Sequence, residues 1–180
     1  MARFLYVDNS NVWIEGMRWA AVYAGLAPDI WYASKQGISD PKWRLDFGKL
    51  LLAINGDPKD IKRAVLFGSR PPENDSLWKS IERKGYEVVI YDRNRSNQEK
   101  KIDVDVATTI IEDSYEKMNA AHDEIILVAG DSDYVPMVEK LIKRGFRVKL
   151  VFWSHASRDL INAVTEFKEL NQFIAQINYN

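Results

Sequence analysis

Aspartates directly follow two apolar segments that have the character of buried strands. Residues 125–129 form a continuous, mostly β-branched apolar run, which is typical of a strand buried on both faces of a parallel sheet. Asp131 and Asp133 come directly after this run. A shorter apolar segment, residues 4–7, likewise ends in Asp8. Because open α/β sheets build their sites at the carboxyl ends of the strands, these three carboxylates are candidates for one site.

A further carboxylate, Asp103, stands near the start of a long predicted helix. Apolar residues at helical spacing predict that this helix covers about residues 102–119. Residues two apart on a helix are separated by about 200°, so Asp103 and Asp105 cannot face the same point if both are helical. We expect Asp103 to point over the edge of the sheet. Asp105 would join it only if the helix started later, and is otherwise a solvated charge.

Structural roles would also explain some of these acids. Asp133 is in position to cap a helix predicted to continue as far as Gly145, and Asp8 could be a turn or cap residue. A helix needs only one such cap, so Asp131 is not explained in this way. The matching positions of Asp8 and Asp131 after two strands favour a site.

The chemistry that clustered carboxylates suit is metal-dependent hydrolysis. Bringing two of them to about 4 Å costs on the order of a few kcal/mol at a protein-surface dielectric, and a hard cation offsets this repulsion. Donor sets made only of oxygen favour Mg²⁺ or Mn²⁺. Such an ion activates water and stabilises the charge that develops on a phosphoryl group. The acids therefore predict hydrolysis of phosphodiester bonds.

The most polar and basic stretch of the chain, residues 92–101, immediately precedes Asp103. A run of cations between two elements is most often a solvated connection. Next to an acid that could bind a metal, however, arginine and lysine could also hold a phosphodiester backbone. We favour this second interpretation, and the residues expected to contact a phosphodiester backbone are Arg93, Arg95, Lys100 and Lys101.

Composition limits the class of protein. A chain of 180 residues with 46% hydrophobic residues predicts one globular domain over residues 1–180. The absence of cysteine excludes disulfides and thiolate metal sites, and is compatible with a reducing cytoplasm. An early charge argues against a secretory signal, and no apolar run is long enough to span a membrane. The net charge is −1, so any binding of phosphates must come from a local patch of positive charge.

Predicted strands alternate with predicted helices along the chain, which implies right-handed crossovers and a mainly parallel sheet. After the last strand, apolar residues at helical spacing predict that the C-terminus is helical and docked on the sheet. The five expected strands cover residues 4–7, 61–67, 86–91, 125–129 and 146–152.

Residues 25–44 are expected to form an insertion-like loop or flap. They contain Trp31, Tyr32 and Trp43 among glycine, proline and serine residues. Exposed aromatic rings could stack on bases, but packing of the loop onto the body of the domain is the favoured interpretation. The segment would equally suit a contact between two copies of the chain in a homodimer.

Several other phosphate-handling classes do not fit the spacing. A haloacid-dehalogenase-type phosphatase would need an aspartate at the position of Ser10, and a Toprim-like domain would need a glutamate at the position of Asp8. The chain has no Gly-x-x-x-x-Gly-Lys phosphate loop and no glycine triplet after its first strand.

Three motifs resemble the NYN domain family, the LabA-like branch of the PIN-like ribonucleases. They are Tyr-Val-Asp-Asn-Ser-Asn at 6–11, Lys-Ile-Asp-Val-Asp-Val at 101–106, and Leu-Val-Ala-Gly-Asp-Ser-Asp-Tyr at 127–134. With Ser157, Arg158 and Leu160 at the last predicted helix, the resemblance covers nearly the whole chain. The chain departs from the family pattern at residues 163–167, Ala-Val-Thr-Glu-Phe, where Ala-Asp commonly precedes the aromatic residue, and at residues 25–44.

The resemblance implies an α/β/α sandwich with an acidic, metal-binding pocket. It predicts a Mg²⁺- or Mn²⁺-dependent endoribonuclease that acts on single-stranded RNA. The alternatives are a catalytically silent RNA-binding or regulatory module of the same fold and, lower in rank, a small-molecule phosphatase. The expected catalytic and metal-binding residues are Asp8, Asp103, Asp131 and Asp133, supported by Asn11, Ser132 and Asp105.

Overall fold

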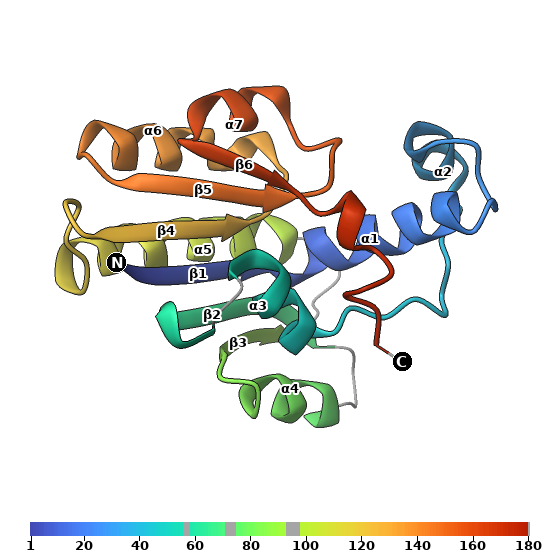
Figure 1. Cartoon of the computed structure of the whole chain (residues 1–180), viewed down its shortest axis with the longest axis horizontal. Helices are drawn as coiled ribbons and strands as arrows, with labels where there is room; N and C mark the ends of the chain where they lie inside the picture. Colours follow the sequence, from blue (N-terminus) through green and yellow to red (C-terminus); the bar gives the residue numbers. More distant parts are fainter. Residues whose placement is uncertain (56–57, 71–74, 93–97, 180) are drawn as a thin grey trace.

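The computed structural model describes residues 1–55, 58–70, 75–92 and 98–179. These residues form one parallel sheet of six strands in the order β3-β2-β1-β4-β5-β6 (Figure 1). The strands are β1 (Ala2–Asp8), β2 (Ile61–Arg70), β3 (Glu87–Asp92), β4 (Asp123–Val128), β5 (Arg147–Phe152) and β6 (Glu166–Glu169). The helices are α1 (Asn9–Tyr23), α2 (Ile30–Gln36), α3 (Phe47–Asn55), α4 (Asp75–Glu82), α5 (Gln98–Glu116), α6 (Val135–Lys143) and α7 (Arg158–Ala163), with short 3₁₀ turns η1 (Pro58–Asp60), η2 (Ser132–Tyr134) and η3 (Asn171–Phe173).

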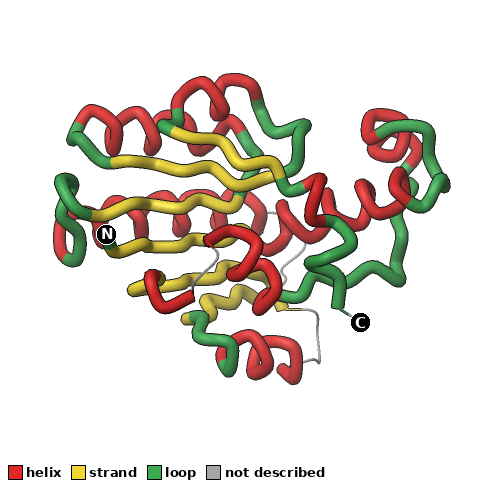
Figure 2. The backbone as a smooth tube through the Cα atoms, viewed as in Figure 1, coloured by secondary structure: helices red, strands yellow, loops and turns green. Residues whose placement is uncertain are grey.

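Helices cover both faces of the sheet, with α5 behind it and α3 in front in the view of Figure 2. The central strands β1 and β4 are accordingly buried on both sides, and residues 4–7 and 125–129 are at most 1% exposed. This arrangement confirms the predicted α/β fold and its parallel sheet. In the described part of the chain, no helix has both the length and the apolar character needed to cross a bilayer.

The expected five strands are joined by a sixth, which the sequence did not predict. We expected helical structure to continue past residue 163, but α7 ends at Ala163 and β6 pairs with β5. Thr165 starts this pairing, because its N–H donates to the Val148 carbonyl and its hydroxyl accepts the Val148 N–H. An ion pair of 2.6 Å between Lys149 and Glu166 adds to it. The apolar spacing in this segment therefore arises from an edge strand and short turns.

Residues 25–44 are more ordered than the predicted loop, because they contain α2. Asp29 caps this helix by accepting the Tyr32 N–H, and Gly37 ends it with a φ of 66° that favours glycine. Trp43 packs into the body, where its ring meets Trp153 edge-on and its Nε1–H donates to the Ile174 carbonyl. Packing onto the body is thus confirmed for Trp43. The α1–α2 pair projects beyond the sheet edge (Figure 1).

Candidate active site

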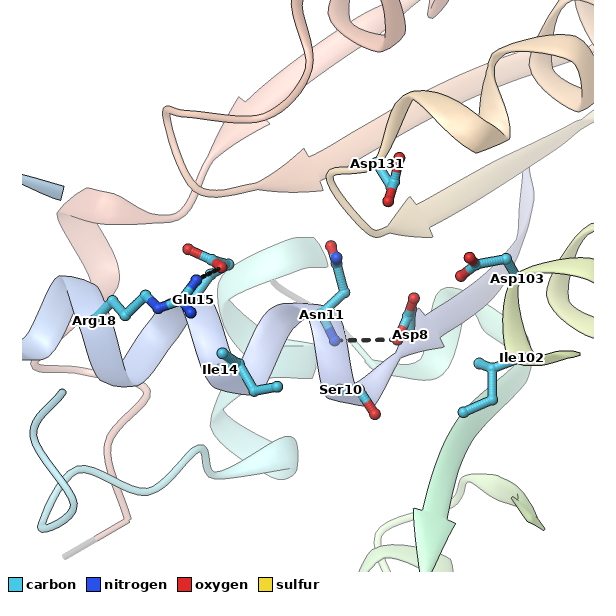
Figure 3. Close-up of a pocket in the computed structure, with 9 residues that line it drawn as sticks. All are labelled: Asp8, Ser10, Asn11, Ile14, Glu15, Arg18, Ile102, Asp103 and Asp131. Atoms are coloured by element: carbon cyan, nitrogen blue, oxygen red, sulfur yellow. Dashed lines mark hydrogen bonds and ion pairs between the residues drawn. The ribbon is translucent and has the colours of Figure 1, made fainter. Parts of the chain in front are cut away.

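The carboxyl ends of β1 and β4 open into a pocket of about 260 Å³. These strands are neighbours in the sheet, with Val7 beside Val128, so the acids that follow them emerge side by side. The first turns of α5 and one side of α1 supply the rest of the wall. Figure 3 shows the carboxylates of Asp8, Asp103 and Asp131 turned toward the same space. The residues that line the pocket are Asp8, Ser10, Asn11, Ile14, Glu15, Arg18, Ile102, Asp103 and Asp131.

Asp8 is the most deeply buried of these acids. It caps α1, because its Oδ1 accepts the Asn11 N–H at 3.1 Å, and only 4% of the residue is exposed. Burial raises the pKa of this carboxyl from 3.8 to about 6, and the charges of Asp103 and Asp131 add to the effect. The hydrogen bonds from Asn11 and Tyr134 oppose it. Ionisation of Asp8 therefore costs free energy in the folded protein, and a nearby cation would lower that cost.

The hydroxyl of Tyr134 connects the two acids that lie on different elements. It lies 3.0 Å from Asp8 Oδ2 and 3.0 Å from Asp103 Oδ1. A hydroxyl has one hydrogen to donate, so it can serve only one of two ionised carboxylates as a donor. The pair is thus arranged to hold an additional proton or a cation. Burial, followed by the charge of Asp8, also raises the pKa of Tyr134 far above its ordinary value, so this phenol stays protonated.

Tyr134 was expected only as the end of a motif, with no role at the site. The spacing of Tyr134 could have indicated a role, because it follows Asp131 by three residues and therefore lies one turn further on, in η2. Its ring is fully buried, however, and residue spacing alone does not indicate that its hydroxyl reaches two other segments.

The structure separates Asp131 from Asp133. Asp131 lines the pocket and caps η2, with its Oδ1 accepting the Asp133 N–H at 3.1 Å and the Ser132 hydroxyl at 3.4 Å. The idea that Asp133 caps the following helix is wrong, because α6 begins only at Val135. Asp133 and Ser132 are both exposed and are not among the residues that line the pocket.

Asp103 and Asp105 also differ, in the sense expected from helical geometry. The helix α5 begins at Gln98, so both residues are helical. Asp103 lines the pocket, whereas Asp105 is not among the lining residues. The late helix start on which a role for Asp105 depended does not occur.

The predicted basic contacts are only partly visible. Arg93 and Arg95 lie outside the described residues, and so does the side chain of Lys100. Lys101 is exposed, and its ammonium group lies 5.4 Å from the centre of the Tyr91 ring, within range of a cation–π contact. Within the part of the chain that the structure describes, the cation that lines the pocket is Arg18 of α1, which forms an ion pair with Glu15.

One face of α1 contributes four residues to the pocket. Asn11, Ile14, Glu15 and Arg18 follow the spacing i, i+3, i+4 and i+7, which places them in a row on a helix. The helical spacing of Ile14, Met17 and Ala21 predicts that all three lie in a buried stripe, but Ile14 is 41% exposed. The row could have been identified from the sequence had the orientation of α1 relative to Asp8 been known.

Asn11 fixes the position of the turn that carries Asp131. Its Oδ1 accepts the Gly130 N–H at 2.8 Å, and the Gly130 carbonyl accepts the Ser157 N–H at 2.9 Å. Glycine is required here, because a Cβ at this position would lie 2.0 Å from Cε1 of Phe152. The two strand-end acids are thereby held in register by both backbone and side-chain contacts.

The donor set fits a hard divalent cation held partly by water. All the pocket carboxylates and amides offer oxygen, the donor that Mg²⁺ and Mn²⁺ prefer. Among the described residues, no three acidic or imidazole groups come close enough to form a complete ligand set. Magnesium commonly binds through one or two carboxylates and keeps several waters. The pair of Asp8 and Asp103, joined through the Tyr134 hydroxyl, suits this mode of coordination.

Comparisons with known proteins agree with this architecture. A family model described as the NYN domain matches residues 23–171, a range that includes Asp103 and Asp131 and begins after Asp8. The crystal structure of a protein of unknown function from Vibrio parahaemolyticus is similar, with a TM-score of 0.66 and 18% sequence identity over 94% of this chain and 92% of that one. At this identity the similarity shows the fold alone. No curated protein matches the chain.

Proposed function

Because the chain belongs to the NYN domain family, a PIN-like nuclease family, we propose that it is a metal-dependent ribonuclease. The observation that carries the proposal is the contact of one buried hydroxyl, that of Tyr134, with the carboxylates of both Asp8 and Asp103. Such an arrangement keeps two negative groups together at the edge of a pocket that also contains Asp131. The reaction proposed is hydrolysis of RNA phosphodiester bonds.

A divalent cation would be held by Asp8 and Asp103, with Asp131 on the other side of the pocket. When bound, Mg²⁺ or Mn²⁺ supplies an activated water and neutralises charge on the phosphoryl oxygens. The acids alone would repel a phosphodiester, so substrate binding in this pocket depends on such neutralisation. Asp133 remains a proposed outer contributor, since its own N–H orients Asp131.

The chain's own residues have separate tasks in this proposal. Tyr134 fixes the relative position of the two inner carboxylates. Asp131 is exposed, so it can accept a proton from a water in the pocket. Arg18 lies at the far end of the row on α1, where its guanidinium can bind non-bridging phosphate oxygens of a neighbouring nucleotide. Lys101, together with Arg93, Arg95 and Lys100, is proposed to contact the RNA backbone.

Internal cleavage is the mode we propose. The pocket residues continue along α1 from Asp8 past Ile14 to Arg18, so a polynucleotide can extend beyond the reacting phosphate. This row supports binding of a continuous strand more than capture of a chain end.

Cleavage of end-labelled and circular single-stranded RNA, with Mn²⁺, Mg²⁺ or EDTA, tests the proposal. We expect cleavage with either metal, none with EDTA, and linear products from the circle. An Asp131→Asn protein purified in the same way should lose the activity, which would exclude a contaminating nuclease. Binding without cleavage under all conditions would instead favour the RNA-binding module.

A further inference from the structure

Two large aromatic side chains of α2 point into solvent. Trp31 is 69% exposed and Tyr32 is 47% exposed, whereas Ile30 and Ala33 of the same helix are buried. The helix packs against α1, and the exposed rings are not buried by that packing. A tryptophan ring left largely in water on a firmly attached helix is a candidate contact for a ligand.

A short series of contacts connects Trp31 with the acidic pocket. The ring of Trp31 meets the ring of His155 edge-on, with their centres 6.1 Å apart. Nε2 of His155 lies 2.7 Å from a carboxylate oxygen of Glu15, which lines the pocket. Trp31 is therefore separated from the pocket wall by a single imidazole ring.

The intervening histidine is held in one orientation. Trp19 donates its Nε1–H to Nδ1 of His155 at 2.9 Å, so Nδ1 acts as an acceptor and Nε2 carries the hydrogen that Glu15 receives. Phe152 packs on the same imidazole, with ring centres 6.0 Å apart. These contacts hold the imidazole of His155 in place beside the Trp31 ring.

Two cations belong to the segments that this contact series joins. Arg18 lies in the pocket, and Lys35 follows Trp31 by four residues, so it occupies the same face of α2 one turn on. One cation is thus found at each end of the contact series, Arg18 beside Glu15 and Lys35 on the helix that carries Trp31. Cations together with an exposed aromatic ring suit a single strand, in which phosphates alternate with bases whose faces are accessible.

We propose that α2 forms a base-stacking subsite for single-stranded RNA beside the acidic pocket, with one base stacked on Trp31. This inference rests on the proposed ribonuclease function, of which it names the substrate class. With a net charge of −1, the chain has little general attraction for phosphates, so stacking supplies a large share of the affinity. A duplex cannot use the subsite, because the faces of its bases are covered.

The test is the dissociation constant of a labelled single-stranded RNA of about twelve nucleotides, measured by fluorescence anisotropy with EDTA and with Ca²⁺. Trp31→Ala and Trp31→Leu should each raise Kd by about 5- to 100-fold, the range expected for one stacked base. Trp31→Phe, which keeps an aromatic face, should recover most of the affinity. Tyr115→Ala is the matched control, because Tyr115 is 71% exposed but lies at the far end of α5.

Two further probes separate stacking from a contact with phosphate. An oligomer of abasic nucleotides and a duplex of the same sequence should bind the wild type and Trp31→Ala equally. The inference is overturned if Trp31→Ala binds the single strand as the wild type does, or if its loss is equally large on the abasic strand. It is also overturned if the wild type binds no RNA in either buffer. Because the assay needs no cleavage, an inactive protein whose binding depends on Trp31 would refute the ribonuclease alone.

Discussion

Among the single residues of the site, the hydroxyl of Tyr134 lies beside more hydrogen-bond acceptors than it has hydrogens to donate. Tyr134 contacts carboxylate oxygens of both Asp8 and Asp103, but it has one hydrogen to donate. Burial raises the pKa of Asp8 to about 6, so without a cation the folded protein resists ionisation of this group. A divalent cation bound in the pocket, as the proposed function requires, would lower this cost.

This electrostatic cost predicts that Asp8→Asn stabilises the metal-free protein at high pH. The folded pKa of Asp8 is raised above its unfolded value, so the stability that Asp8 contributes is lost as pH rises from about 4 through about 6. Asparagine avoids the loss, and its amide can donate to Tyr134, which then donates to Asp103. We expect a gain in the free energy of unfolding of about 1–3 kcal/mol at pH 8 in EDTA.

Urea unfolding of both proteins across this pH range measures the difference. The gain should disappear below about pH 4, where Asp8 is protonated in both the folded and the unfolded state. Adding Mg²⁺ should stabilise the wild type more than the variant. A variant that is less stable than the wild type at pH 8 in EDTA would show that Asp8 is held as a favourable charge.

At the scale of elements, the turn after β4 determines where Asp131 lies. Gly130 is in contact with Phe152 of β5, and its N–H is bonded to Asn11 of α1. This one residue thus connects two strands and a helix at the sheet edge. A side chain at position 130 would overlap the Phe152 ring, so this backbone position requires glycine.

Gly130→Ala should therefore destabilise the protein by about 1–3 kcal/mol, since the added Cβ overlaps the Phe152 ring. Thermal or urea unfolding measures the loss. In the double variant with Phe152→Leu the penalty should be smaller than the sum of the two single changes, because the ring that blocks the Cβ is gone. Strict additivity would show that the glycine acts through something other than this contact.

Elements whose burial is complete could be predicted from the sequence. The runs at 4–7 and 125–129 gave β1 and β4 because both faces of these strands are covered, which leaves no polar position. The edge strand β6 was missed, since three of its four residues, Glu-Phe-Lys-Glu, are charged and the apolar residues around it also fit a helical period. The helix α2 was missed within a segment rich in residues that break helices.

The candidate site was predictable to the extent that topology alone fixes it. Parallel strands bring their carboxyl ends to one edge, so Asp8 and Asp131 could be placed together from the sequence. The orientation of α1 could not be predicted in this way, so Glu15 and Arg18 of that helix were missed. The choice between Asp131 and Asp133 depended on a 3₁₀ turn before α6, a detail that hydrophobic spacing does not encode.

At the scale of the whole molecule, a nearly neutral chain combines an acidic pocket with a projecting helical pair. The net charge is −1, so neither the fold nor its overall field attracts RNA strongly. In the proposed function, affinity for RNA would come from a neutralised pocket, from local cations such as Arg18, and from exposed rings on α2. We propose that catalysis takes place in the pocket that α1, α5 and the carboxyl ends of β1 and β4 enclose.

The most direct measurement of that claim is the rate of RNA cleavage in Mn²⁺ by Asp103→Asn beside Asp105→Asn. The two changes are chemically identical and lie two residues apart on α5, but only Asp103 lines the pocket. We predict that Asp105→Asn cleaves at the wild-type rate and that Asp103→Asn is slower by at least ~100-fold while still folded. Equal rates for the two variants would contradict the account.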